Sequence, residues 1–244
     1  MDSVLAGDFP TWNPMHGPGR SCANFGGEPQ MPYRVLRHMP TPITIERLTR
    51  ADLPKSTIAL ARYLIGKTLV HDTRRGRIAG RIVETEAYLV GDAAAHSFGG
   101  MTKRNRPLFM ERGHSYVYFI YGNHFMLNIS GNRDGVGEGV LLRAAEPIEG
   151  IGLMRRHRAA LDSTKLEDLA RGPGRLADAF AIDRSLDAID MVDGKSPLWL
   201  GTSVRKRSAI GESVRIGITK EAERVLRFYE RGSKFISGTK KLNV

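Results

Sequence analysis

Residues 81–128 constrain the fold more than any other part of the chain, because they combine strand patterns with a long polar connection. Apolar and polar side chains alternate through residues 77–89, as in a strand with one face toward a core. Residues 115–121 and 125–130 are rich in aromatic and β-branched side chains and flank a Gly-Asn pair, which predicts a β-hairpin. This stretch is therefore predicted to form the centre of a β-sheet.

The flanking sequence predicts helices and further strands. A helix signal begins with Asp52 as its cap and stops at Gly66. Pro147 is expected to open a second helix that runs toward Arg158, and a Gly-Pro-Gly turn at Pro173 precedes a third. The glycines of that turn suit either a bound phosphate or a purely structural bend. Further strands are expected at residues 67–72 and 139–145.

The first 42 residues contain seven of the twelve prolines and show no apolar periodicity. This composition predicts a flexible arm over residues 1–42. The folded domain is expected to start near Ile43 and to occupy residues 43–244, which is long enough for one sizeable core. We therefore expect a single mixed domain of the α+β class.

The charge balance points to a polyanionic partner. The chain has 37 basic and 26 acidic residues, a net charge of +11, and a pI near 10.0. Nucleic acid is the first candidate for such a field. The single cysteine, Cys22, excludes an internal disulfide and a Cys-rich zinc site, which favours a reducing compartment. No apolar run approaches the roughly 18 residues of a membrane span, so we expect no membrane association. We also expect no metal and no other cofactor.

Two carboxylates stand close together in the first strand pattern. Glu84 and Glu86 share one face of the expected strand with Tyr88, at a separation of about 6–7 Å along it. If the pair is partly buried, one pKa rises and the other group stays ionised. The spacing also resembles the carboxylate separation used to split glycosidic bonds. A solvated strand face with two acids is the alternative interpretation.

Aromatic side chains gather in the same part of the sequence. Tyr88, His96, Tyr116, Tyr118 and Tyr121 lie within forty residues. Rings of this kind stack on nucleobases. Tyr116 is expected in the core, whereas Tyr121 beside the hairpin tip is a candidate wedge between base pairs.

The register of the hairpin decides whether its side chains share a cavity. A two-residue turn would place Tyr118 opposite Leu127, whereas a three-residue turn at residues 122–124 would place it opposite Asn128. We predict the three-residue form. Asn128 and Arg143 stand among apolar residues, so each needs polar partners if buried, and a carboxylate suits Arg143. An Arg143 ion pair that only locks the sheet is the alternative.

Six blocks of sequence, in order, resemble the alkyladenine DNA glycosylases, also called methylpurine glycosylases. The blocks are RIVETEAYLVGDAAAHS, RNRPLF, YVYFIYGNHFMLNIS, GVLLRAAEP, RGPGRLADAF and LRFYERGS. The resemblance extends from about Leu48 to Ile236. It implies a mixed α/β domain with a curved antiparallel sheet, flanking helices and a protruding β-hairpin that inserts into DNA.

The resemblance also implies the reaction, which is hydrolysis of the bond between a damaged purine and its deoxyribose. Glu86 would activate the water, and Arg143 would help to position it together with a main-chain carbonyl at Glu230. Where this chain has Glu230, a known enzyme of the resembled family has an apolar residue, so that a third carboxyl group would lie near the water here.

The remaining site residues follow from the same resemblance. The implied base-binding pocket consists of Tyr88, Ala94, His96, Tyr118 and Asn128, and Tyr121 is the implied intercalating ring. By their charge, Lys103, Arg104 and Arg106 are expected to contact the DNA backbone.

These features together predict a monomeric, monofunctional glycosylase. Its expected substrate is double-stranded DNA with alkylated or deaminated purines. Its expected location is the cytoplasm, beside the nucleoid, in a prokaryote, or the nucleus in a eukaryote. Two other classes remain open. One is a non-catalytic nucleic-acid binder, and the other is a metal-dependent nuclease built on Glu84, Glu86 and Asp92.

Overall fold

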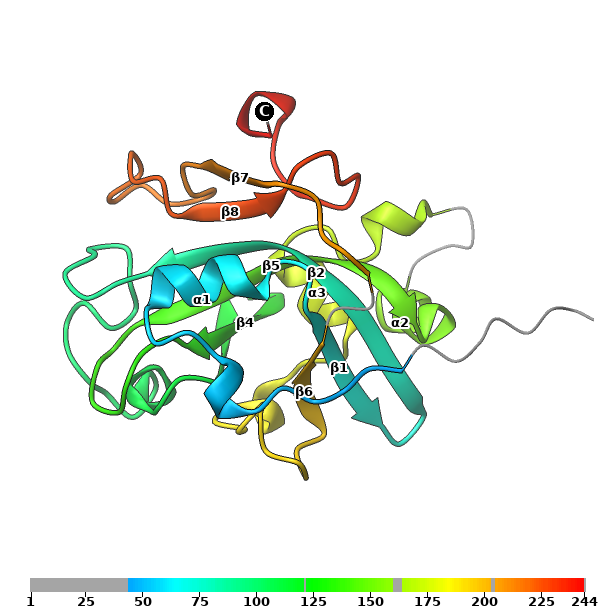
Figure 1. The fold of residues 1–244 in the computed structure, drawn as a ribbon, viewed down its shortest axis with the longest axis horizontal. Helices are drawn as coiled ribbons and strands as arrows, with labels where there is room; N and C mark the ends of the chain where they lie inside the picture. Colours follow the sequence, from blue (N-terminus) through cyan, green and yellow to red (C-terminus); the bar gives the residue numbers. More distant parts are fainter. Residues whose placement is uncertain (1–43, 121, 160–163, 203–204, 244) are drawn as a thin grey trace, which may run out of the picture. The chain divides into compact units, whose positions relative to one another are not determined.

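A computed structural model describes residues 44–120, 122–159, 164–202 and 205–243, which belong to a compact unit that spans residues 42–244. The expected arm and Tyr121 lie outside the described residues. The described part consists of one antiparallel sheet, curled into a half-barrel, and three α-helices (Figure 1). The α+β class and the antiparallel sheet are confirmed.

The strands follow the order β3-β4-β5-β2-β1-β6, with β8 paired to β2 and β7 paired to β8. Their bounds are β1 Thr68–Thr73, β2 Gly76–Tyr88, β3 Ser115–Ile120, β4 His124–Ser130, β5 Gly139–Glu149, β6 Leu198–Gly201, β7 Ile210–Ser213 and β8 Arg227–Glu230. The α-helices are α1 Thr57–Leu64, α2 Ile151–His157 and α3 Pro173–Ala179. Short 3-10 helices are present at Arg50–Asp52, Arg106–Phe109, Leu166–Asp168, Arg184–Leu186 and Lys240–Leu242.

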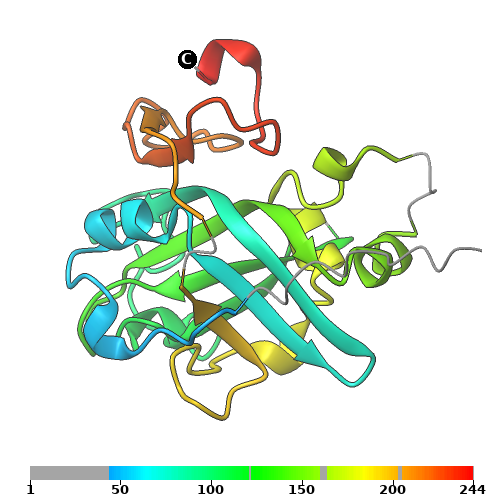
Figure 2. The same ribbon diagram turned by 45° about the vertical axis from the view of Figure 1, so that its right-hand side comes forward.

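Strand β2 organises the sheet because it changes partner along one edge. Its first half pairs with β1, whereas Glu84–Glu86 pairs with β8. The other edge pairs with β5 from Ala79 to Tyr88, with irregular register around Glu84. Such bulges bend a strand and re-aim its side chains. As a result, β7, β8 and the C-terminal residues lie over one end of the sheet (Figures 1 and 2).

The apolar stripes of the helices cover the sheet. In α1, Thr57, Leu60, Ala61 and Leu64 are buried at helical spacing and form one face. The helix starts later than expected, because Thr49 and Asp52 form a capping box on a separate 3-10 turn.

The second helix also starts later than expected. Strand β5 continues past Ala145 to Glu149, and Pro147 pairs with Gly80 of β2 beside a register shift. The helix then begins at Ile151, after Gly150 takes a left-handed conformation with φ of 73°. A proline is tolerated in this strand because the ladder is irregular there.

Both registers considered for the hairpin are wrong. Tyr118 lies opposite Met126, and Tyr116 lies opposite Asn128. Ile120 pairs with His124, so three residues separate the paired positions, and the pairing differs by two positions from the predicted three-residue form. Because the side-chain period of a strand is two, this shift leaves Tyr118 and Asn128 on the same face. The expected shared pocket is therefore retained.

Candidate active site

A cavity of about 270 Å³ opens between β2, β3, β4, β5 and the loops that follow β2 and β7. It brings together the residues expected to bind a base, which are Tyr88, Ala94, His96, Tyr118 and Asn128. Arg143 lines the same cavity. The size is close to the lower end of small-molecule sites.

Stacked and tilted rings form one wall of this cavity. The rings of Tyr116 and Tyr118 stack with centroids 5.2 Å apart and an interplanar angle of 26°. His96 meets Tyr118 edge to face at 4.4 Å, and its Nδ1 lies 2.9 Å from the Tyr116 hydroxyl. Tyr116 is only 1% exposed, as expected for a core residue, and supports the other two rings from behind. These contacts hold the three rings against one another in the cavity wall.

His96 is suited to contact a ligand as a neutral ring. Its side chain is exposed at the cavity, although desolvation and the nearby Arg104 lower the pKa of its imidazole. A neutral imidazole can accept or donate a hydrogen bond without adding charge to the pocket.

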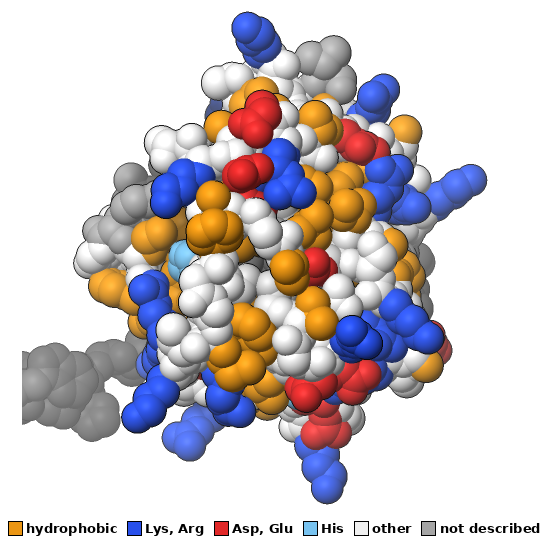
Figure 3. Space-filling view, turned by 90° about the vertical axis from the view of Figure 1, so that its left-hand side faces the viewer, with side chains coloured by type: hydrophobic (Ala, Val, Ile, Leu, Met, Phe, Trp, Pro, Cys, Tyr) orange, Lys and Arg blue, Asp and Glu red, His pale blue; other side chains and the backbone are white. Residues whose placement is uncertain are grey.

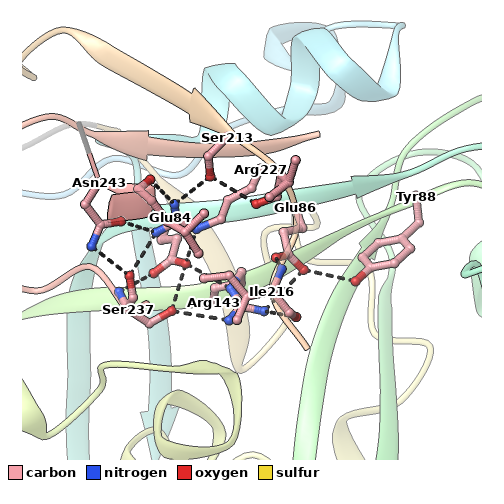
Figure 4. Close-up of polar contacts among 11 residues, drawn as sticks. Glu84, Glu86, Tyr88, Arg143, Ser213, Ile216, Arg227, Ser237 and Asn243 are labelled. Carbon is pink, nitrogen blue, oxygen red and sulfur yellow. Dashed lines mark hydrogen bonds and ion pairs between the residues drawn. The ribbon is translucent and has the colours of Figure 1, made fainter. Parts of the chain in front are cut away.

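The Glu86 carboxylate lies directly behind three residues of the cavity wall (Figure 4). Oε1 accepts a 2.8 Å hydrogen bond from the Ile216 amide, and Oε2 accepts one of 3.0 Å from the Tyr88 hydroxyl. Nη1 of Arg143 lies 3.2 Å from Oε2. Burial raises the pKa of Glu86 even though Arg143, Ile216 and Tyr88 oppose the shift.

Glu84 has a different environment, although it is also fully buried. Its Oε1 accepts hydrogen bonds from Nε of Arg143 at 2.9 Å and from Nε of Arg227 at 2.7 Å. Burial alone would raise the pKa of Glu84, but these two cations outweigh it and lower the pKa. The interpretation of a solvated face is therefore wrong. The pKa of Glu84 lies below the ordinary glutamate value, whereas the pKa of Glu86 lies above it.

Arg143 bridges the two acids, which confirms the expected carboxylate partner. Its Nη1 also lies 3.5 Å from the main-chain carbonyl of Ile216. Figure 4 shows Arg143 between Glu84 and Glu86, with Ile216 beside it. The same guanidinium lines the cavity.

The family resemblance implies a water-positioning main-chain carbonyl at Glu230, and the structure shows the contacts of the Glu230 side chain. The Glu230 carboxylate forms a buried ion pair with Arg81 and accepts a hydrogen bond from the Ser208 amide. Among the described residues it makes no hydrogen bond or ion pair with Glu86 or Arg143. The main-chain carbonyl that lies within 3.5 Å of Arg143 belongs to Ile216, and because Ile216 makes these contacts through its backbone, its side chain gave no signal in the sequence.

The loop that contains Lys103, Arg104 and Arg106 lies at the edge of the cavity. Lys103, Arg104 and Arg106 are all exposed, and Arg104 lines a shallow hollow next to His96. The buried Asn105 fixes the loop, because its amide donates 2.9 Å hydrogen bonds to the carbonyls of His96 and Gly100. The connection between β2 and β3 lies at the left of Figure 1, and from that side Figure 3 shows hydrophobic side chains gathered among Lys and Arg side chains.

The carboxylates of the expected nuclease site do not form a common cluster. Asp92 is fully buried in an ion pair with Arg215, whereas Glu84 and Glu86 share Arg143. Within the part of the chain that the structure describes, no group of three metal-ligating side chains is found. The same residues include no helix long and apolar enough to span a bilayer.

Comparison with known proteins decides the family. The methylpurine-DNA glycosylase family matches residues 51–234. A protein of Mesorhizobium japonicum is 59% identical over 195 residues, which cover 80% of this chain and 92% of the relative. A protein of Paraburkholderia phytofirmans is 48% identical, with coverages of 81% and 91%, and one of Methanoculleus marisnigri is 43% identical, with coverages of 78% and 98%. Each of the three carries 3-methyladenine DNA glycosylase as its provisional name.

The chain belongs to the methylpurine-DNA glycosylase family. Like other methylpurine-DNA glycosylases it is a DNA repair enzyme, a hydrolase that acts on N-glycosyl bonds, and its substrate is DNA. The non-catalytic binder is therefore set aside.

Proposed function

We propose that this glycosylase flips alkylated or deaminated purines out of duplex DNA and hydrolyses their N-glycosidic bond with a water activated by Glu86. The observation that carries the proposal is the position of a buried carboxylate with a raised pKa directly behind an aromatic-walled cavity. A base inside a duplex hides the bond to its sugar, so extrusion into such a pocket is required, at a cost of a few kcal/mol.

The aromatic wall suits electron-poor purines. Purines alkylated on a ring nitrogen, such as 3-methyladenine and 7-methylguanine, are cationic. A cation over a tyrosine ring gains about 0.5–2 kcal/mol. Tyr118 and His96 present their rings to the cavity from one side, and Tyr88 closes it near Glu86. Ethenoadenine and hypoxanthine would bind through stacking, because they are neutral.

Three groups converge where the attacking water is required. The Glu86 carboxylate accepts its proton, and the negative charge opposes the cation that develops on the sugar. The Ile216 carbonyl accepts a second hydrogen bond from the same water. Arg143, within reach of both groups, fixes their orientation. Water oxygen then bonds to the sugar carbon as the bond to the base breaks, and a cationic lesion leaves without prior protonation.

Asn128 would exclude normal guanine. Its side chain lies in the cavity wall and is 7% exposed. Among the described residues its side-chain amide has no hydrogen-bond partner. An amide facing the edge of the flipped base would clash with the exocyclic amine of guanine, so normal guanine would fit badly.

The rest of the DNA interface is proposed from charge and position. Lys103, Arg104 and Arg106 would bind phosphates at the edge of the cavity. The hairpin of β3 and β4, with Tyr121 at its tip, would enter the minor groove and fill the gap left by the flipped base. The enzyme would act as a monomer, since one chain supplies all of these groups.

Release of free base from defined duplexes tests the proposal. The protein is incubated in excess chelator with duplexes that carry 3-methyladenine, 7-methylguanine, ethenoadenine or hypoxanthine. We expect excision of at least one lesion and an intact abasic strand, with no adduct trapped by borohydride. No released base from any duplex, or activity that requires an added divalent metal, would contradict it.

A further inference from the structure

The C-terminal segment, residues 237–243, reaches into the polar cluster behind the cavity (Figure 4). The Ser237 hydroxyl donates a 2.8 Å hydrogen bond to Oε1 of Glu84, and its amide donates one of 2.5 Å to Oε2. The same hydroxyl accepts a 3.3 Å hydrogen bond from Nη2 of Arg143. One serine therefore contacts both members of the buried ion pair.

A second guanidinium fastens this segment to the cluster. Arg227 is fully buried and uses Nε for Glu84. Its Nη1 donates to the Leu242 carbonyl at 3.1 Å, and its Nη2 donates to the Ser237 carbonyl at 2.9 Å and to Oδ1 of Asn243 at 2.8 Å. The Asn243 amide returns a 3.1 Å hydrogen bond to Ser237. The segment thus satisfies donors that would otherwise be buried without partners.

These contacts determine which guanidinium nitrogen of Arg143 points toward Glu86 and the Ile216 carbonyl. Glu84 engages Nε and Ser237 engages Nη2, so that Nη1 is the group left toward Glu86 and the Ile216 carbonyl. A planar guanidinium held at two of its nitrogens has little freedom to rotate. Its third nitrogen is therefore fixed relative to the proposed water.

We infer that Ser237 is a positioning residue, which acts with the rest of the C-terminal segment to aim Arg143 at Glu86 and the Ile216 carbonyl. The inference rests on the proposed function of that site. The family match ends at residue 234, so the positioning group lies beyond the matched region. Glu84 also gains a function here, because it anchors Arg143 while Glu86 acts on the water.

Substitution of Ser237 tests the inference under single-turnover conditions with a lesion-containing duplex. Ser237→Ala removes the hydroxyl and keeps the backbone hydrogen bond to Glu84. We expect the maximal excision rate to fall about tenfold, the effect of one misdirected charge-assisted hydrogen bond, while the half-saturating enzyme concentration stays unchanged. Ser237→Thr, which restores a hydroxyl, should recover most of the rate.

Ser233→Ala is the matched control, because Ser233 lies on the same C-terminal stretch and its hydroxyl contacts only the Phe235 amide among the described residues. It should excise at the wild-type rate. In Ser237→Ala a less firmly held Arg143 should lower the pKa of Glu86 less, so that this pKa rises further. The acid limb of the excision rate should therefore move to higher pH. A purely structural role would lower the melting temperature and leave this limb in place.

An unchanged maximal rate for Ser237→Ala would overturn the inference while the proposed function stands. So would an equal loss in Ser233→Ala, or a loss that Ser237→Thr does not recover. Absence of excision by the wild-type protein would instead remove the proposed function on which the inference rests.

Discussion

Replacing Arg143 with methionine should destabilise the protein strongly, because the side chain is 7% exposed and bridges two buried carboxylates. Removing one partner of a buried ion pair costs about 3–5 kcal/mol. Glu84 keeps Arg227 at 2.7 Å, and Glu86 keeps its hydrogen bonds from Tyr88 and Ile216. We therefore expect the lower end of that range, about 3 kcal/mol, in a domain whose total stability is about 5–15 kcal/mol.

The loss of stability should depend on pH with a definite sign. Without Arg143 the pKa of Glu86 rises further above its unfolded value, because burial is opposed less. A group whose folded pKa is raised destabilises the protein above that pKa, and this contribution disappears as the pH falls through it. The destabilisation by Arg143→Met should therefore be larger near neutral pH than near about pH 5.

Urea unfolding at the two pH values measures this effect by linear extrapolation. Arg106→Met is the control, since Arg106 is exposed and its loss should change stability by no more than about 0.5 kcal/mol. A loss below about 1 kcal/mol for Arg143→Met, the range of exposed pairs, or an equal loss at both pH values, would refute the reasoning.

Three further predictions concern catalysis and DNA binding. Burial raises the pKa of Glu86, so the excision rate should rise with pH along an acid limb whose apparent pKa lies above the ordinary glutamate value of about 4.3. An apparent pKa at or below that value would contradict the assignment of Glu86 as the base. Asn128→Ala should begin to release normal guanine from undamaged duplexes, whereas continued refusal of guanine would show that another group discriminates. Replacing Lys103, Arg104 and Arg106 together with alanine should make the negative slope of log affinity against log salt less steep by about three, and an unchanged slope would exclude them as phosphate contacts.

The sequence predicted the buried partner of Arg143 because a cation in an apolar strand has few ways to be satisfied. It also predicted the face shared by Tyr118 and Asn128, since any connection with an odd number of residues leaves the two side chains on one face of a hairpin whose strands have a period of two. The register itself was wrong by two positions, because the residues at the tip allow several three-residue turns.

Other features depend on tertiary contacts that local sequence patterns do not predict. Ile216 contributes a main-chain carbonyl and amide, so its side chain gives no signal. The ion pair between Glu230 and Arg81 forms only because β8 pairs with both β7 and β2. The extension of β5 through Pro147 likewise depends on its irregular pairing with β2.

The most direct measurement is single-turnover excision by Glu86→Gln from a duplex that carries 3-methyladenine. Glutamine keeps the size of the side chain and one of the two acceptor oxygens. The Ile216 amide can therefore keep its acceptor, while the Tyr88 hydroxyl can accept a hydrogen bond from the new amide group, so lesion binding should stay within a few-fold of wild type. Excision should fall by about 10²–10⁴-fold, the usual contribution of a general base. Excision within about tenfold of wild type, at full occupancy, would show that another group activates the water and would contradict the central claim.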